Sequence, residues 1–91
     1  MRLYWFLVAW AVSLTMRPGV RYGWRSYRWH MLRAAVLERD GHACRGCGVS
    51  AVWGVTWLEV HHKRPVASGG GHGPGNLISL CRSCHVKKHS V

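Results

Sequence analysis

Near its C-terminus the chain reads Cys81-Arg82-Ser83-Cys84-His85-Val86-Lys87-Lys88-His89. Two residues separate Cys81 from Cys84, and the other cysteine pair, Cys44 and Cys47, repeats this spacing. Two thiolates at this spacing can grip one tetrahedral zinc ion from a single tight turn. Gly46 supplies flexible backbone in the first turn, where amides must point at sulfur. The pattern predicts one structural zinc site. The alternatives are two disulfides, which need an oxidising compartment, or four unrelated buried thiols.

Length and charge limit the classes of protein that fit. The chain has 91 residues and a formal net charge of +10, from 13 Lys and Arg against 3 Asp and Glu. A domain this small buries only about 60% of its unfolded surface, so we expect bound metal to supply part of the folding free energy. Strong positive charge favours a polyanionic partner, most commonly nucleic acid. The alternative is a basic surface that is merely solvated.

Residues 1–25 differ in composition from the rest. Residues 3–16 are apolar, but this stretch is too short for a membrane span, which needs about 20 residues. It has the look of a signal peptide or anchor; the alternatives are a hydrophobic extension packed on the domain, or a start codon assigned too far upstream. Residues 17–25 combine Pro, Gly and Arg and predict a flexible basic arm. We therefore divide the chain into a hydrophobic extension with a basic linker, 1–25, and a folded domain, 26–91.

The folded part has recognisable helix and strand signals. Ser26 is placed to cap a helix that runs to about Arg39, with Gly41 as its stop. The β-branched and aromatic run 55–60 predicts a strand that ends at His61-His62. Residues 76–80 predict a second short strand, and residues 82–90 a closing helix.

The histidines form the second chemical feature. Neighbouring residues of a strand point to opposite sides, so His61 and His62 cannot both face one ion. His85 and His89 are spaced i, i+4 and share a helix face, so they can bind one metal together, and His61 would complete a site with open positions for water or phosphate. Three isolated histidines are interpreted as solvated or hydrogen-bonded rings: His30, His42 and His72.

At this point the chain resembles the HNH endonucleases. The resemblance covers about residues 26–90 and is carried by three segments: the helix and knuckle at 29–44, Leu58-Glu59-Val60-His61-His62-Lys63-Arg64-Pro65 with Gly69-Gly70, and Asn76-Leu77-Ile78-Ser79-Leu80 running into the second knuckle and His85. It implies a small α+β fold, a ββα-metal core with a structural zinc and an N-terminal helix.

The resemblance also implies roles. His62 would be the general base that deprotonates the attacking water, with its ring oriented by Asn76. His61, His85 and His89 would hold one divalent ion, Mg²⁺, Mn²⁺, Ni²⁺ or Zn²⁺, on the scissile phosphate. Many members have Asp in place of His61, and a histidine there favours softer metals over magnesium. Basic side chains near the site would bind the DNA backbone without reading bases: Lys63, Arg64, Arg82, Lys87 and Lys88.

The residues and the resemblance together predict a metal-dependent DNA endonuclease, and the resemblance implies products that carry 5′-phosphate and 3′-hydroxyl ends. The competing hypothesis is a zinc-stapled module that binds nucleic acid without activity, which would have no use for His62 and Asn76 together. Sequence specificity would need a partner protein or self-association. We expect a cytoplasmic protein of a bacterium or a phage-infected cell. An N-terminal signal or anchor is the alternative, and it leaves membrane contact through residues 3–16 open.

Overall fold

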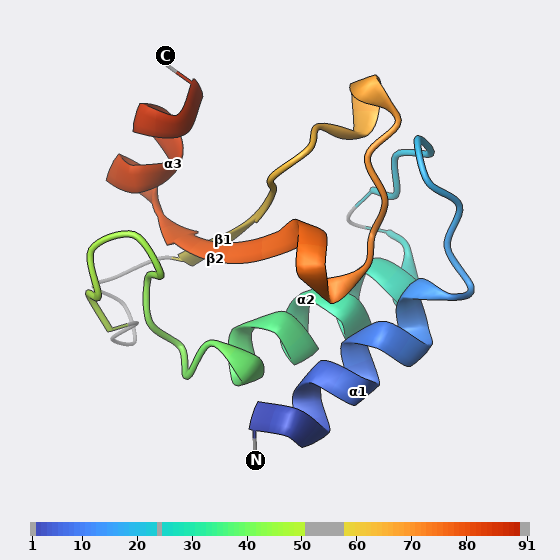
Figure 1. Cartoon of the computed structure of the whole chain (residues 1–91), viewed down its shortest axis with the longest axis horizontal. Helices are drawn as coiled ribbons and strands as arrows, with labels where there is room; N and C mark the ends of the chain where they lie inside the picture. Colours follow the sequence, from blue (N-terminus) through green and yellow to red (C-terminus); the bar gives the residue numbers. More distant parts are fainter. Residues whose placement is uncertain (1, 24, 51–57, 90–91) are drawn as a thin grey trace.

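A computed structural model describes residues 2–23, 25–50 and 58–89. The elements follow one another as α1 (Arg2–Ser13), α2 (Tyr27–Arg39), β1 (Leu58–His62), the short 3-10 turns η1 (Val66–Ser68) and η2 (Pro74–Asn76), β2 (Leu77–Cys81) and α3 (Arg82–His89). Figure 1 shows α1 and α2 side by side beneath the two strands, with α3 leaving the far end of β2. This arrangement confirms the predicted small α+β fold.

The two strands form an antiparallel pair that ends in the second cysteine turn. Leu58 pairs with Cys81 at one end, and His62 pairs with Leu77 at the other. The predicted strand signal begins at residue 55, but residues 55–57 lie outside the described part of the chain. β2 begins at Leu77 rather than Asn76, because Asn76 belongs to the turn η2. α3 follows β2 directly and completes the ββα unit.

Helix α2 has the ends that its sequence predicts. The Ser26 hydroxyl accepts a hydrogen bond from the amide of Trp29 at 3.3 Å, which satisfies an N–H that the first helical turn leaves without a partner. The helix stops at Arg39, and Gly41 follows with a positive φ of 68°, a conformation that suits glycine. Buried side chains of α2 form the centre of the core: Leu32, Ala35, Val36 and Leu37.

The C-terminal end of α2 is fixed to β2 through Arg39 and Asp40. Asp40 is buried, and its Oδ2 accepts a hydrogen bond from the Ser79 amide at 2.9 Å. The Arg39 guanidinium donates to the other carboxylate oxygen at 2.8 Å and to the carbonyls of Pro74 and Leu77 at 2.7 and 2.8 Å. Helix and strand are therefore held in register by a charged pair.

Helix α1 packs on α2. Its Ala9 and the following Met16 join the buried cluster of Leu32, Ala35 and Val36. The opposite side of α1 is exposed, with Leu3 and Leu7 70% and 50% accessible, and Leu14, just after the helix, is 67% accessible. Of the helices in the described residues, none is both long enough and apolar enough to cross a membrane.

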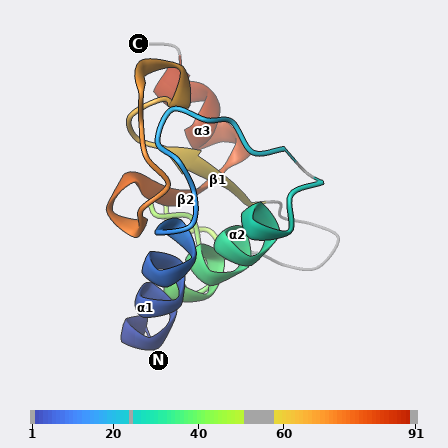
Figure 2. The same cartoon turned by 90° about the vertical axis from the view of Figure 1, so that its right-hand side faces the viewer.

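The segment after α1 differs from the flexible arm that its composition predicts. The Gly19 amide donates to the Gly70 carbonyl at 3.0 Å, and the Val20 carbonyl accepts a hydrogen bond from the His72 ring at 2.8 Å. Figures 1 and 2 show this stretch lying along the loop between β1 and β2. The contacts are made by the backbone of Gly19 and Val20, between Arg17 and Arg21. Composition alone cannot distinguish such a bound segment from a linker. The domain boundary at residue 26 stays a prediction.

Candidate active site

The four cysteines come together in one cluster. Their Sγ atoms all lie within 4.8 Å of one another, and Cys47 and Cys81 are 3.7 Å apart. A tetrahedral zinc ion about 2.3 Å from each sulfur separates neighbouring sulfurs by about 3.8 Å. All four residues are free thiols rather than two disulfides. The cluster is therefore positioned to bind a metal ion, and its donor set fits zinc.

The first cysteine turn is shaped around sulfur. The amides of Gly46 and Cys47 point at the Cys44 sulfur at 3.3 and 3.4 Å. Burial raises the pKa of Cys44, but amide donors from Cys81, Cys47 and Gly46 outweigh it and lower the pKa to about 6. Hydrogen bonds with Cys44 and Cys81 raise the pKa of Cys84 to about 12. Four thiolates can thus coexist here only around a cation.

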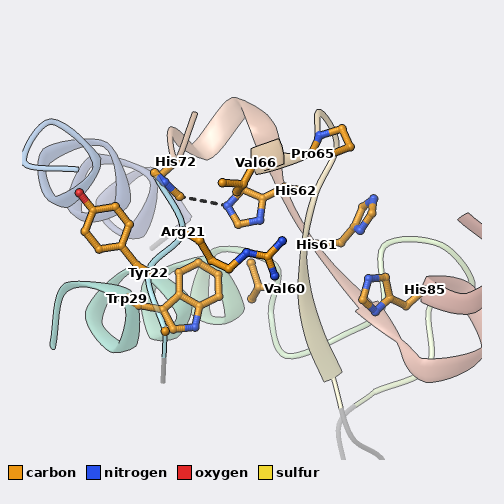
Figure 3. A pocket seen from close by; sticks show the side chains of 11 residues that line it. Arg21, Tyr22, Trp29, Val60, His61, His62, Pro65, Val66, His72 and His85 are labelled. Carbon is orange, nitrogen blue, oxygen red and sulfur yellow. Dashed lines mark hydrogen bonds between the residues drawn. The ribbon is translucent and has the colours of Figure 1, made fainter. Parts of the chain in front are cut away.

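A pocket of about 430 Å³ lies on the histidine side of β1. Five parts of the chain line it: the segment after α1, the start of α2, the β1 end with its following turn, the glycine-rich loop that contains His72, and α3. Figure 3 shows the side chains that converge there. Its polar and aromatic lining consists of Arg21, Tyr22, Trp29, His61, His62, His72 and His85.

The two neighbouring histidines of β1 face different surroundings, as strand alternation predicts. His62 stacks on Trp29 of α2, with ring centroids 5.6 Å apart and planes 14° apart. His61 meets His85 of α3 edge to face, with centroids 4.9 Å apart. Figure 3 shows the two rings on either side of the strand. His61 and His85 are thus placed to share a ligand, and His62 is not.

Glu59 orients His85, a contact that the sequence interpretation missed. The carboxylate of Glu59 accepts a hydrogen bond from Nδ1 of His85 at 2.7 Å. Burial raises the pKa of Glu59, but the hydrogen bond from His85 and the charges of His85 and Arg82 lower it below its ordinary value. A carboxylate on Nδ1 leaves Nε2 as the lone-pair nitrogen, the arrangement common behind metal-binding histidines. Glu59 and His61 are two residues apart and therefore lie on one face of the strand. This spacing could have predicted that Glu59 lies beside the expected metal-binding histidines.

The third expected ligand lies at the edge of the described structure. His89 is the last residue of α3, and its side chain is outside the described part. Within the described part of the chain, one group of three or more possible metal ligands lies close enough to hold an ion, and it is the cysteine cluster. At the position where the sequence analysis expects a second ion, the structure has two facing imidazoles, His61 and His85, and the carboxylate of Glu59 beside His85.

His62 is hydrogen-bonded to a histidine that the sequence analysis treated as isolated. Nε2 of His62 lies 3.0 Å from Nδ1 of His72, and His72 is only 3% exposed. Burial lowers the pKa of His62 to about 4, and positive charge on His72, His61 or Arg21 acts in the same direction. His62 is therefore neutral near pH 7. A single histidine in a glycine-rich loop carries no periodicity, so sequence alone gives no reason to pair it with β1.

Asn76 contacts different partners from those expected. Its Oδ1 accepts a hydrogen bond from the Arg64 amide at 2.8 Å, and its Nδ2 donates to the carbonyls of Arg64 and Gly71 at 3.1 and 2.8 Å. Both amide hydrogens are thus used on backbone. The side chain ties the chain after β1 to the glycine-rich loop, and these hydrogen bonds do not involve the His62 ring.

The five predicted phosphate-binding residues, Lys63, Arg64, Arg82, Lys87 and Lys88, are all exposed. Arg82 also contacts the second carboxylate oxygen of Glu59 at 3.2 Å. Arg21 is a further cation at the pocket, and it comes from the segment that was expected to form the arm. Positive charge therefore lies on both sides of the histidines.

Comparison with known proteins gives a consistent result. Residues 44–91, just over half of the chain, match the family model described as HNH endonuclease. No solved structure matches the chain significantly.

Three curated proteins are similar to part of the chain. The type IV methyl-directed restriction enzyme EcoKMcrA of Escherichia coli K12 is 36% identical over 63 residues, 65% of this chain and 23% of the enzyme. The Zorya protein ZorE of the Crooks strain of Escherichia coli is 30% identical over 60 residues, 66% of this chain and 16% of ZorE. The Gene 4 protein of Mycobacterium phage D29 is 37% identical over 59 residues, 65% of this chain and 55% of that protein. The chain thus spans less than two thirds of the length of each.

Proposed function

Because the chain belongs to the HNH endonuclease family, we propose that it is a metal-dependent endonuclease that hydrolyses phosphodiester bonds in DNA. The observation that carries the proposal is the division of labour across β1. A neutral His62 faces the pocket from one side of the strand, while His61 and His85 meet on the other. General-base catalysis beside an ion-binding pair needs two such positions a few ångströms apart.

His62 is the general base. A neutral imidazole can accept a proton from water, and the low pKa of His62 keeps the ring neutral at physiological pH. The water oxygen bonds to phosphorus as the bond from phosphorus to the 3′ oxygen breaks. The proton of the attacking water passes to His62, and the 3′ oxygen takes a proton from solvent. The products carry 5′-phosphate and 3′-hydroxyl ends.

His61, His85 and His89 would hold the divalent ion, with Glu59 fixing the His85 ring. When bound, the ion stabilises charge on the phosphate and on the leaving 3′ oxygen. Imidazole nitrogens are better ligands for Mn²⁺, Ni²⁺ or Zn²⁺ than for Mg²⁺, which prefers sites rich in carboxylate oxygens. The donor set thus supports the softer metals without fixing one.

The remaining predicted residues have supporting roles. Lys63, Arg64, Arg82, Lys87 and Lys88 would neutralise phosphates on either side of the cut, and they carry no base information. Asn76 would keep the loop after β1 in place through its three backbone hydrogen bonds. Cys44, Cys47, Cys81 and Cys84 would bind one structural zinc that stabilises the fold.

Cleavage of supercoiled plasmid by the purified chain across a panel of divalent metals tests the proposal. His62→Ala should slow cleavage by about 10²–10⁴-fold, the usual scale for a lost general base, with zinc content and DNA affinity unchanged. His85→Ala should also slow cleavage, but part of its loss should return at high metal concentration, because the variant lacks a ligand. His42→Ala is the matched control, because His42 is exposed and bonds Glu38 away from the pocket.

The result would also decide between the two candidate functions. Equal cleavage by wild type and His62→Ala in every metal would show that the motif has no catalytic role. DNA binding by the wild-type protein without cleavage in any metal would favour the zinc-stapled binding module.

A further inference from the structure

The starting observation is the bond between His72 and the backbone of Val20. His72 Nε2 lies 2.8 Å from the Val20 carbonyl oxygen. A carbonyl oxygen can only accept, so Nε2 of His72 must carry the hydrogen. The ring is 3% exposed, and its two hydrogen-bond partners are a carbonyl and a second imidazole. Neither partner compensates a positive charge, and a buried charge without compensation is costly. His72 is therefore the neutral Nε2–H tautomer, with an acceptor at Nδ1.

The tautomer of His72 dictates that of His62. Nδ1 of His72 faces Nε2 of His62 at 3.0 Å, and a hydrogen bond between two neutral rings needs one hydrogen. Since Nδ1 of His72 accepts, Nε2 of His62 donates. The lone pair of His62 then lies on Nδ1. Figure 3 shows the dashed bond from His62 to His72, with the second nitrogen of His62 on the other side of the ring.

We propose that His72 is a positioning residue for the catalytic base: it holds the hydrogen of His62 on Nε2 and leaves Nδ1 as the atom that accepts the proton from water. The proposal rests on the proposed role of His62 as base. It also gives the segment after α1 a place in the active site, because the Val20 carbonyl fixes the tautomer of His72.

Neighbouring side chains hold the hydrogen-bonded rings of His62 and His72 in place. The Tyr22 ring packs edge to face against His72, with centroids 5.1 Å apart. The Tyr22 hydroxyl accepts a hydrogen bond from the Arg17 amide at 3.0 Å, which closes the segment on itself. On the other side, Trp29 stacks on His62. Each of the two rings thus packs against an aromatic neighbour. The hydrogen bond between the rings then determines which nitrogen of His62 carries the hydrogen.

The experiment uses the full chain with zinc bound and compares His72→Leu with His72→Gln. The glutamine amide offers an acceptor oxygen and a donor nitrogen, as the neutral imidazole offers one accepting and one donating nitrogen, whereas leucine offers neither. His42→Leu controls for loss of a histidine outside the pocket. Ring ¹⁵N chemical shifts report the tautomer of His62, whose signals are assigned by their loss in His62→Ala. Cleavage of a duplex oligonucleotide gives kcat and KM.

Wild-type His62 should be the Nε2–H tautomer. In His72→Leu the two tautomers of His62 should mix, and kcat should fall by about 10- to 100-fold, the scale for loss of an orienting partner, with KM unchanged. His72→Gln should keep most of the wild-type kcat and most of the Nε2–H tautomer of His62. A wild-type Nδ1–H tautomer, or a His72→Leu variant with unchanged kcat and tautomer, would overturn the proposal.

The spectroscopic reading separates this inference from the proposed function. If the wild-type protein fails to cleave DNA, the base assignment of His62 fails, while the ¹⁵N shifts still show whether His62 donates to His72. If His72→Leu does not fold, the wild-type tautomer and the His72→Gln kinetics decide the question.

Discussion

Glu59 of β1 and His85 of α3 are joined by a hydrogen bond of 2.7 Å, across the interface between the hairpin and the last helix. The carboxylate reaches the ring nitrogen on the side away from the one needed for a metal. A residue to which the sequence analysis assigned no role thus sets the direction in which a motif histidine presents its lone pair.

Glu59→Gln should weaken binding of the catalytic metal. The amide is uncharged and holds the Nδ1 hydrogen of His85 less strongly, so Nε2 becomes a poorer donor; loss of such partners typically costs about 10- to 100-fold in metal affinity or activity. The metal concentration for half-maximal plasmid cleavage measures the effect. Glu38→Gln is the matched control, because Glu38 contacts the exposed His42 one helical turn away. Equal metal requirements in both variants would leave Glu59 without a role at the site.

His62 should remain neutral well below the pH at which an ordinary histidine, with a pKa of about 6.5, becomes charged. Burial lowers the pKa of His62 to about 4, and positive charge on His72, on His61 and on the permanently charged Arg21 acts in the same direction. In Arg21→Gln one of these charges is absent, so the pKa should rise but stay below 6.5, because burial remains. An NMR titration of the His62 ring, without added catalytic metal, measures both values.

The same shift links pH to stability. Below pH 6.5 the unfolded chain binds this proton before the folded chain does, so stability contributed by a neutral His62 is lost as the pH falls from 6.5 toward 4. A His62 midpoint near 6.5 in the wild-type protein would contradict the buried, neutral ring.

Gly46→Ala should damage the cysteine cluster. A Cβ at this position would lie 2.9 Å from the Cys84 sulfur and 3.2 Å from Cys84 Cβ, closer than unstrained contacts allow. We expect weaker zinc retention against a chelator and a lower midpoint of thermal unfolding. Gly73→Ala is the control, because nothing lies within 4 Å of its Cβ position and its φ is −66°. Elemental analysis of wild type should find about one zinc per chain; intact disulfides without zinc would refute the site.

Asp40→Asn should destabilise the protein by roughly 1–3 kcal/mol, the cost of weakening a buried charge-assisted network. Burial raises the pKa of Asp40, but hydrogen bonds from Arg39 and Ser79 outweigh it and lower the pKa below the ordinary 3.8. The stabilisation is therefore full above 3.8 and is lost only as the pH falls through the folded-state value. Urea unfolding of both proteins measures the gap, and the subtraction cancels the contribution of the cysteines. A gap that already shrinks between about pH 7 and 5 would mean that the pKa is raised.

Local signals predicted much of the fold. Ser26 and Gly41 gave the ends of α2, because capping chemistry depends on a few neighbouring residues. The paired cysteine spacing predicted a cluster that the structure brings together. The alternation of a strand placed His61 and His62 in different environments.

Contacts between distant segments could not be predicted in this way. His72 lies in a glycine-rich loop with no period, and its partner Val20 is 52 residues earlier in the chain. The segment 17–23 has the composition of a linker, and it is bonded to the domain through backbone groups that every residue carries. Hydrogen bonds of this kind leave no mark on the choice of side chain, so only the three-dimensional arrangement reveals them.

The hydrogen bond between Val20 and His72 also bears on the order of folding. It closes a loop that contains α2, the first cysteine turn and β1, and long loops of this kind close after local contacts have formed. A nascent or partly denatured chain can therefore contain α2 and the hairpin before the hydrogen bond that sets the tautomer of His62 has formed. On the proposed mechanism, full cleavage activity is therefore acquired after the helix and the hairpin have formed.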